Sequence, residues 1–168
     1  VEPFAREKAR SIAIARPTVL VLGSDTVIEL DGPLLGKPVD LADARVMLTK
    51  LAGRPHDVHT AVALCRQAPH QGSVAVETAT VQMKAYDEAA IEGYLATQEP
   101  MGKAGAYSIQ GMGGELIQTI SGDFTGIVGL PLRTVAILLV GAGEAVPVDV
   151  DALYQDKPYP NWARFTHD

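Results

Sequence analysis

Apolar and polar positions along the chain follow two different periods, one typical of helices and the other of strands. Residues 3–15 place apolar side chains along one helical face, and Pro3 suits the first turn of that helix. A second helix is expected to begin after Asp40, a residue type that caps helices, and to end at Gly53. Helices are therefore predicted over residues 3–15, 41–52, 87–97 and 132–140.

Short apolar or alternating runs predict the strands. Thr18–Leu22 is β-branched and apolar, which indicates a buried strand, and within 73–84 successive residues would point to opposite faces of a sheet. Strands are predicted over residues 18–22, 26–30, 57–65, 73–84, 115–120 and 124–128. Because helices and strands do not alternate strictly, and some strands are joined by short turns, the pattern favours an α/β domain with a mixed sheet and flanking helices.

The length of 168 residues fits one domain with its own core. From about residue 147 the chain carries Pro158, Pro160 and several polar residues. We expect this part to be an extended or loosely docked tail, in which Tyr154, Tyr159 and Trp162 could act as anchors.

Composition excludes several classes of partner. The formal net charge of −6 argues against sequence-independent binding to a nucleic acid polymer, which needs basic patches. No stretch reaches the roughly 18 to 20 uninterrupted apolar residues of a membrane span, and no signal peptide is visible, so no membrane association is expected. Cys65 is the one cysteine and cannot form an internal disulfide, which suggests a reducing compartment.

Two residues near the second predicted strand suggest phosphate chemistry. Asp25 follows an apolar strand, and sheets of the α/β class tend to place ligands at such rims, although an Asp that only shapes a turn is the simpler interpretation. Lys37 lies between Gly36 and Pro38, where it could bind a phosphate or be a solvated turn residue. Together, a carboxylate that holds Mg²⁺ or a water and a nearby cation favour a phosphate site.

The segment KAGAYSIQGMGG, Lys103–Gly114, is rich in glycine and could turn backbone N–H groups toward an anion or a base. Its spacing fits neither a Walker A loop nor a dinucleotide-binding fingerprint. Gln110 has a donor and an acceptor that could read a nucleobase edge, whereas a flexible loop is the alternative. His56 and His59 are three apart on a predicted strand and would face opposite ways, so a shared metal is not expected.

Six motifs in this order resemble the Maf family of nucleoside triphosphate pyrophosphatases and cover roughly residues 3–140. They are AREKAR (5–10), GSDTVIELDGPLLGKP (23–38), LAGRPHDVHTAVAL (51–64), VETATVQ (76–82), KAGAYSIQG (103–111) and SGDFTGIVGLPL (121–132). The resemblance implies an elongated two-lobed α/β fold of the Maf/ITPase-like type with a central cleft. It also implies a cytoplasmic homodimer and a nucleotide pyrophosphatase that uses Mg²⁺ or Mn²⁺. Residues 1–146 would form this domain, and 147–168 the C-terminal tail.

The resemblance also assigns roles to individual residues. Asp25 matches the proton acceptor that would activate or position the attacking water, directly or through Mg²⁺. Lys8, Lys37 and, less directly, Lys103 match lysines that bind the phosphates. Thr26 and Gln110 resemble the branch that prefers dTTP and UTP over 7-methyl-GTP.

One part of the family pattern is not found. Family members usually begin with a strand and a phosphate-binding loop of the form SxSPRR, and this sequence begins after that point. A catalytically inactive nucleotide-binding protein linked to septum or division control is therefore the alternative function. A general phosphatase, releasing orthophosphate, is a third hypothesis.

Overall fold

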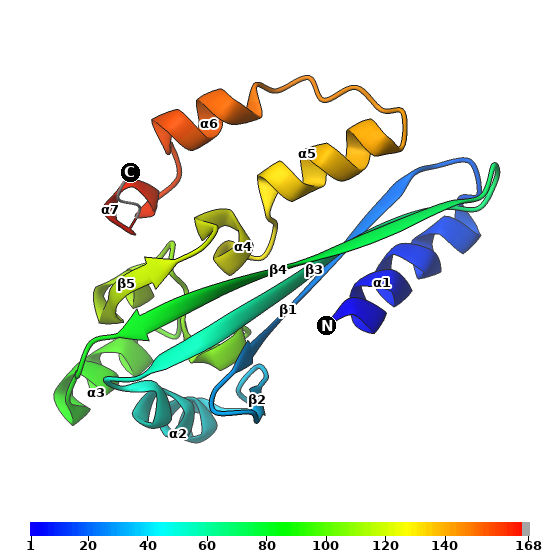
Figure 1. Cartoon of the computed structure of the whole chain (residues 1–168). Helices are drawn as coiled ribbons and strands as arrows, with labels where there is room; N and C mark the ends of the chain where they lie inside the picture. The colour runs from blue at the N-terminus through cyan, green and yellow to red at the C-terminus, as the bar shows by residue number, and fades with distance from the viewer. Residues whose placement is uncertain (166–168) are drawn as a thin grey trace.

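The computed structural model describes residues 1–165, which form one five-stranded sheet with helices packed against it (Figure 1). The strand order is β2-β1-β3-β4-β5, and every pairing is antiparallel. The strands are β1 (Val21–Glu29), β2 (Leu34–Leu35), β3 (Pro55–Arg66), β4 (Gln71–Met83) and β5 (Ile117–Ser121). The predicted α/β class with flanking helices is confirmed, but the sheet is antiparallel rather than mixed. At its centre, the short connection between β3 and β4 allows only a hairpin.

Strand β1 is continuous, so the prediction of two strands over 18–22 and 26–30 was wrong. Its register with β3 runs without a break from Val21 opposite Cys65 to Glu29 opposite Asp57. Asp25 therefore lies in the middle of a strand, opposite Ala61, and not at a strand end. Within residues 1–165, β2 pairs only with the last two residues of β1, which leaves the rest of β1 at the sheet edge. Asp25 therefore lies on the open side edge of the sheet and not at the end of a strand.

Seven α-helices and two 3₁₀ turns complete the described chain. The helices are α1 (Glu2–Ala15), α2 (Leu41–Leu51), α3 (Glu88–Ala96), α4 (Phe124–Val128), α5 (Leu132–Gly141), α6 (Val150–Asp156) and α7 (Trp162–Phe165), and the turns are η1 (Ala104–Ala106) and η2 (Met112–Leu116). The predicted helices are confirmed, and Asp40 caps α2 by accepting a hydrogen bond from the Asp43 amide. In residues 1–165, no helix has both the length and the apolar run needed to cross a bilayer.

The strand predicted over 124–128 is instead helix α4. Asp123 caps this helix by accepting a hydrogen bond from the Thr125 amide, and Gly129 ends it in the left-handed conformation at φ 118°. A β-branched sequence favoured a strand, but the two end signals and the burial of Phe124 decide the outcome.

Helix α1 packs unusually close to β1 and β3. Ala5, Ala9 and Ala13 are fully buried on the face that meets the sheet. A Cβ at Gly23 would lie 2.4 Å from the Ala5 carbonyl oxygen and 2.7 Å from the Ala9 amide nitrogen, so only glycine allows this approach. Figure 1 shows α1 on one side of the long strands and α5 on the other. This packing places one turn of α1 directly over the centre of β1.

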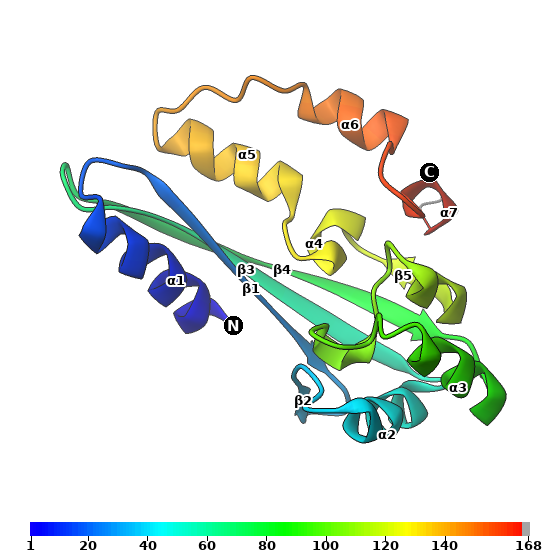
Figure 2. The same cartoon turned by 180° about the vertical axis from the view of Figure 1, so that it is seen from behind.

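The C-terminal segment forms helices α6 and α7 and joins the main core, so the expectation of an extended or loosely docked tail was wrong (Figure 2). Trp162 is 1% exposed and lies between the rings of Phe124 and Tyr159, with ring centroids 5.7 Å apart in both pairs. Burial of a tryptophan of this size contributes a few kcal/mol. The prediction that Tyr154 and Trp162 act as anchors is confirmed.

Candidate functional site

All six residues predicted for the site line one cleft of about 380 Å³, which we call the central cleft. They are Lys8, Asp25, Thr26, Lys37, Lys103 and Gln110. They come from α1, β1, the segment after β2 and the glycine-rich loop, which we define as residues 102–114. Apolar side chains, among them those of Ile28, Val58 and Ile127, also line the cleft. The cleft therefore combines cations, one carboxylate, an amide and apolar surface, which is the mixture that a nucleotide requires.

Lys8 and Asp25 form an ion pair at the cleft. The Lys8 Nζ lies 2.8 Å from Asp25 Oδ1 and donates a second hydrogen bond to the Ser24 carbonyl at 3.0 Å. The Asp25 side chain is 17% exposed, whereas that of Lys8 is 57% exposed. Such a half-exposed pair adds little to stability. Its importance lies in holding a carboxylate and an ammonium together where a ligand can reach both.

Thr26 is oriented by a buried hydroxyl on the neighbouring strand. Thr60 Oγ1 lies 2.7 Å from the Gly126 carbonyl oxygen and can only be the donor in that bond. Because a hydroxyl has a single hydrogen, Thr26 must donate in the 2.8 Å contact between the two threonines. Ser24 donates to the Gly129 carbonyl at 2.6 Å. These bonds join β3 to the middle of α4 and β1 to its C-terminal end, which forms one wall of the cleft.

The glycine-rich loop meets the segment that carries Lys37 through a backbone contact. The Gly105 amide donates to the Gly36 carbonyl at 3.0 Å, so Lys37 and Lys103 come to the same part of the cleft. Gly105 has φ 69°, and a Cβ there would lie 2.5 Å from Ile28 Cδ1. A side chain at this position would therefore be strained, and the end of the Ile28 side chain would have to move.

Tyr94 and Glu99 hold the glycine-rich loop against α3. The Tyr94 hydroxyl donates to Glu99 Oε1 at 2.7 Å and accepts from the Ser108 amide at 3.1 Å. The Glu99 carboxylate also accepts from the amides of Met112 and Gly113, both at 3.0 Å. Partial burial raises the pKa of Glu99, but the hydrogen bonds from Tyr94, Gly113 and Met112 outweigh it and lower that pKa overall. Glu99 therefore stays ionised as an anchor of the loop.

His56 and His59 lie in different surroundings. His56 is buried and its Nε2 contacts the Tyr107 hydroxyl at 2.7 Å, whereas His59 contacts Thr78 and Glu29. This agrees with the prediction that the two side chains face opposite ways. Within residues 1–165 no three side chains among His, Cys, Asp and Glu are grouped to hold a metal ion.

Sequence reasoning missed Thr60, Tyr94 and Glu99. Each acts through a partner at least five residues away along the chain, and Thr60 contacts a carbonyl 66 residues away. No local spacing indicates such contacts. Only the position of Glu99 shortly before a glycine-dense segment could have drawn attention to it.

Comparisons with known proteins agree with the sequence motifs. A family model described as "Maf-like protein" matches residues 1–142. A dTTP/UTP pyrophosphatase of Bordetella parapertussis is 48% identical over 131 residues, which is 78% of this chain and 62% of that protein. One of Symbiobacterium thermophilum is 48% identical over 139 residues, 82% of this chain and 71% of that protein. The chain thus spans less than two thirds of the Bordetella relative.

Proposed function

The chain belongs to the Maf family, and from that premise we propose that it hydrolyses nucleoside triphosphates, with dTTP and UTP preferred, to the monophosphate and pyrophosphate. The single observation that carries this proposal is that Lys8, Asp25, Lys37, Lys103 and the base-reading candidates all line one cleft. The names of the two relatives, dTTP/UTP pyrophosphatase, support the same substrates.

In the proposed reaction Asp25 is the general base. Its carboxylate accepts a proton from a water molecule whose oxygen attacks the α-phosphorus of the nucleotide. The bond between the α-phosphorus and the oxygen that bridges to the β-phosphate breaks, and pyrophosphate leaves. Lys8, 2.8 Å from Asp25, orients the carboxylate and offsets negative charge near the reacting phosphate.

Lys37 and Lys103 bind the β- and γ-phosphates in this proposal. Both line the cleft, and the backbone bond from Gly105 to Gly36 keeps their two segments together. Positive charge on this side stabilises the pyrophosphate as negative charge develops on it.

A divalent cation fits the donor set of the cleft. The six site residues include one carboxylate, that of Asp25, and Mg²⁺ is commonly bound by one or two carboxylates together with substrate phosphates. Asp25 and phosphate oxygens of the substrate would therefore hold Mg²⁺ or Mn²⁺. A bound cation would neutralise phosphate charge.

Thr26 and Gln110 recognise the base in this proposal. The Gln110 amide supplies both a donor and an acceptor, which matches the adjacent carbonyl and N–H of thymine or uracil. Within residues 1–165 its side chain makes no hydrogen bond, so these groups are available to a ligand. We also propose that the protein is a cytoplasmic homodimer, which light scattering and fractionation would test.

The test is to incubate the full chain and Mg²⁺ with dTTP, UTP, CTP, GTP or 7-methyl-GTP, and to measure pyrophosphate and orthophosphate separately. Pyrophosphate from dTTP and UTP, reduced about 10²- to 10⁴-fold in Asp25→Asn, is the expected result. Asp57→Asn is the matched control, because Asp57 lies on β3, outside the cleft lining, and accepts a hydrogen bond from Thr80 that an amide oxygen can also accept.

Two other outcomes would contradict the proposal. Nucleotide binding without turnover would favour the regulatory alternative. Orthophosphate as the first product would favour a general phosphatase.

A further inference from the structure

Asn161 makes hydrogen bonds on both sides of Gln110. Its Nδ2 donates to the Ile109 carbonyl at 2.8 Å and to the Gly111 carbonyl at 3.1 Å. An amide NH₂ group has two hydrogens, so both are used on the residues that flank Gln110. We propose that Asn161 is a positioning residue that fixes the backbone at Gln110 and thereby sets base selectivity; this inference rests on the proposed function.

The backbone conformation at Asn161 and a glycine opposite its amide both allow this contact. Asn161 has φ 68°, a left-handed conformation that asparagine adopts more readily than most residues. A Cβ at Gly114 would lie 2.6 Å from Asn161 Nδ2, so a glycine there leaves room for the amide. The Gly111 amide in turn bonds to the Ser108 carbonyl at 3.3 Å and closes the turn that presents Gln110.

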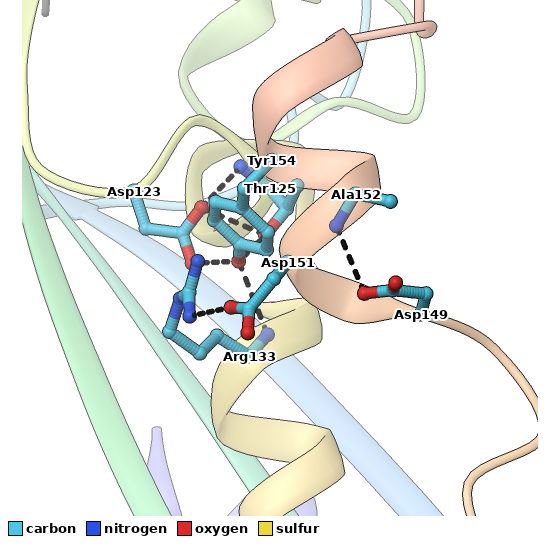
Figure 3. A network of polar contacts seen from close by, with 7 residues as sticks. All are labelled: Asp123, Thr125, Arg133, Asp149, Asp151, Ala152 and Tyr154. Atoms are coloured by element: carbon cyan, nitrogen blue, oxygen red, sulfur yellow. Dashed lines mark hydrogen bonds and ion pairs between the residues drawn. The ribbon is translucent and has the colours of Figure 1, made fainter.

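The position of Asn161 is itself fixed by the segment around it. The next residue, Trp162, is 1% exposed in the core, and its ring stacks on that of Phe124 with ring centroids 5.7 Å apart. Further back, the Tyr154 hydroxyl donates to Asp123 Oδ2 at 2.6 Å, as Figure 3 shows. The C-terminal segment is therefore anchored before and after Asn161.

Figure 3 also shows how α6 meets the two helices that follow β5. Arg133 pairs with Asp151 at 2.6 Å, and its guanidinium lies 4.4 Å from the centre of the Tyr154 ring. Its backbone amide donates to the Tyr154 hydroxyl at 3.1 Å. Asp149 caps α6 by accepting from the Ala152 amide. These contacts fix α6 against α4 and α5, and so help to fix the position of the segment that carries Asn161.

Selectivity depends on this contact because the Gln110 side chain makes no hydrogen bond within residues 1–165, so its place is set by the backbone that carries it. Tyr94 and Glu99 hold Ser108, Met112 and Gly113, but the carbonyls next to Gln110 are bonded to Asn161. A donor–acceptor pair discriminates between bases only where its place and orientation are fixed. A displacement of about 1 Å can cost about 10²-fold in rate.

The experiment compares Asn161→Gly and Asn161→Asp with the unsubstituted chain. Glycine accepts the left-handed backbone and removes only the amide, whereas aspartate keeps the shape but turns an oxygen toward two carbonyls. The first readout is the ratio of dissociation constants for the α,β-imido analogues of dCTP and dTTP. The second is amide hydrogen exchange over residues 108–114. We expect each variant to lower the ratio about 10-fold and to speed exchange by a similar factor.

Two controls make the result specific. Arg164→Gln removes another contact between the same segment and residue 115, and it should leave the binding ratio unchanged. Gln110→Ala shows how much of the ratio depends on that side chain. Unchanged ratio and exchange in Asn161→Gly would overturn the proposal, as would an unchanged ratio in Gln110→Ala. Both readouts need no turnover, so lack of pyrophosphate release would refute the proposed function but would not decide the role of Asn161.

Discussion

The ammonium of Lys8 on α1 lies 2.8 Å from the carboxylate of Asp25 on β1, although 17 residues separate them in sequence. The pair exists because Gly23, two residues before Asp25, lets the helix backbone approach the strand. Gly23, which has no functional side chain, therefore controls the distance between the Lys8 ammonium and the Asp25 carboxylate.

Replacing Lys8 by methionine should weaken catalysis. The variant loses a charge-assisted interaction with Asp25 and the phosphates, so we expect kcat/KM for dTTP to fall about 10- to 100-fold. Lys8→Arg should retain part of the activity because it keeps the charge. Steady-state pyrophosphate release measures the effect, with Lys50→Met on α2 as the control. Equal kinetics in Lys8→Met and Lys50→Met would refute a role for Lys8.

Gly23→Ala should both destabilise the protein and impair catalysis. The new methyl group would press on the backbone of Ala5 and Ala9, and such overpacking costs about 1–3 kcal/mol of the free energy of unfolding. Moving α1 would also displace Lys8 from Asp25. Urea denaturation and pyrophosphate release measure the two effects. Gly72→Ala on β4 is the matched control, because nothing lies within 4 Å of its Cβ position; equal stability of the two variants would contradict the packing argument.

Thr60→Val should cost stability although it preserves shape. The change leaves the Gly126 carbonyl and the Thr26 hydroxyl without their buried partner, which costs about 1–3 kcal/mol of unfolding free energy. Thr49→Val on α2 removes only a hydrogen bond to the Arg45 carbonyl at an exposed position and should be nearly neutral. Thermal and urea unfolding compare the two. An equal stability of Thr60→Val and Thr49→Val would contradict the prediction.

His56 should make stability depend on pH in the mildly acidic range. Burial lowers its pKa in the folded protein from 6.5 to about 4, so between these values the unfolded chain binds more protons. Stability due to the neutral imidazole is therefore present above about pH 6.5 and is lost as the pH falls toward 4. The loss is about 3 kcal/mol by pH 4.

The measurement for His56 is urea unfolding at several pH values, compared with His56→Gln. Glutamine can still bond to the Tyr107 hydroxyl but does not titrate. Carboxylates contribute to both curves, so the difference between them isolates His56. If the unfolding free energies of the two proteins changed in parallel from pH 7 to pH 4, a lowered pKa of His56 would be contradicted.

Local sequence determined most of the elements and the candidate residues. The helix over 41–51 follows from Asp40 before an amphipathic run and a glycine after it, which are signals within one or two turns. The alternating strand over 71–83 is likewise visible from its period of two. The six motif residues could be named because their neighbours form recognisable local patterns.

Tertiary structure decided what local signals left open. Strand β1 passes through Gly23 and Asp25 because β3 pairs with its whole length, and α4 is a helix because its end signals and the packing of Phe124 outweigh β propensity. The bond from Asn161 to the carbonyls beside Gln110 spans at least 50 residues. Propensity and periodicity act over one element, whereas burial and backbone hydrogen bonds select partners from the whole chain.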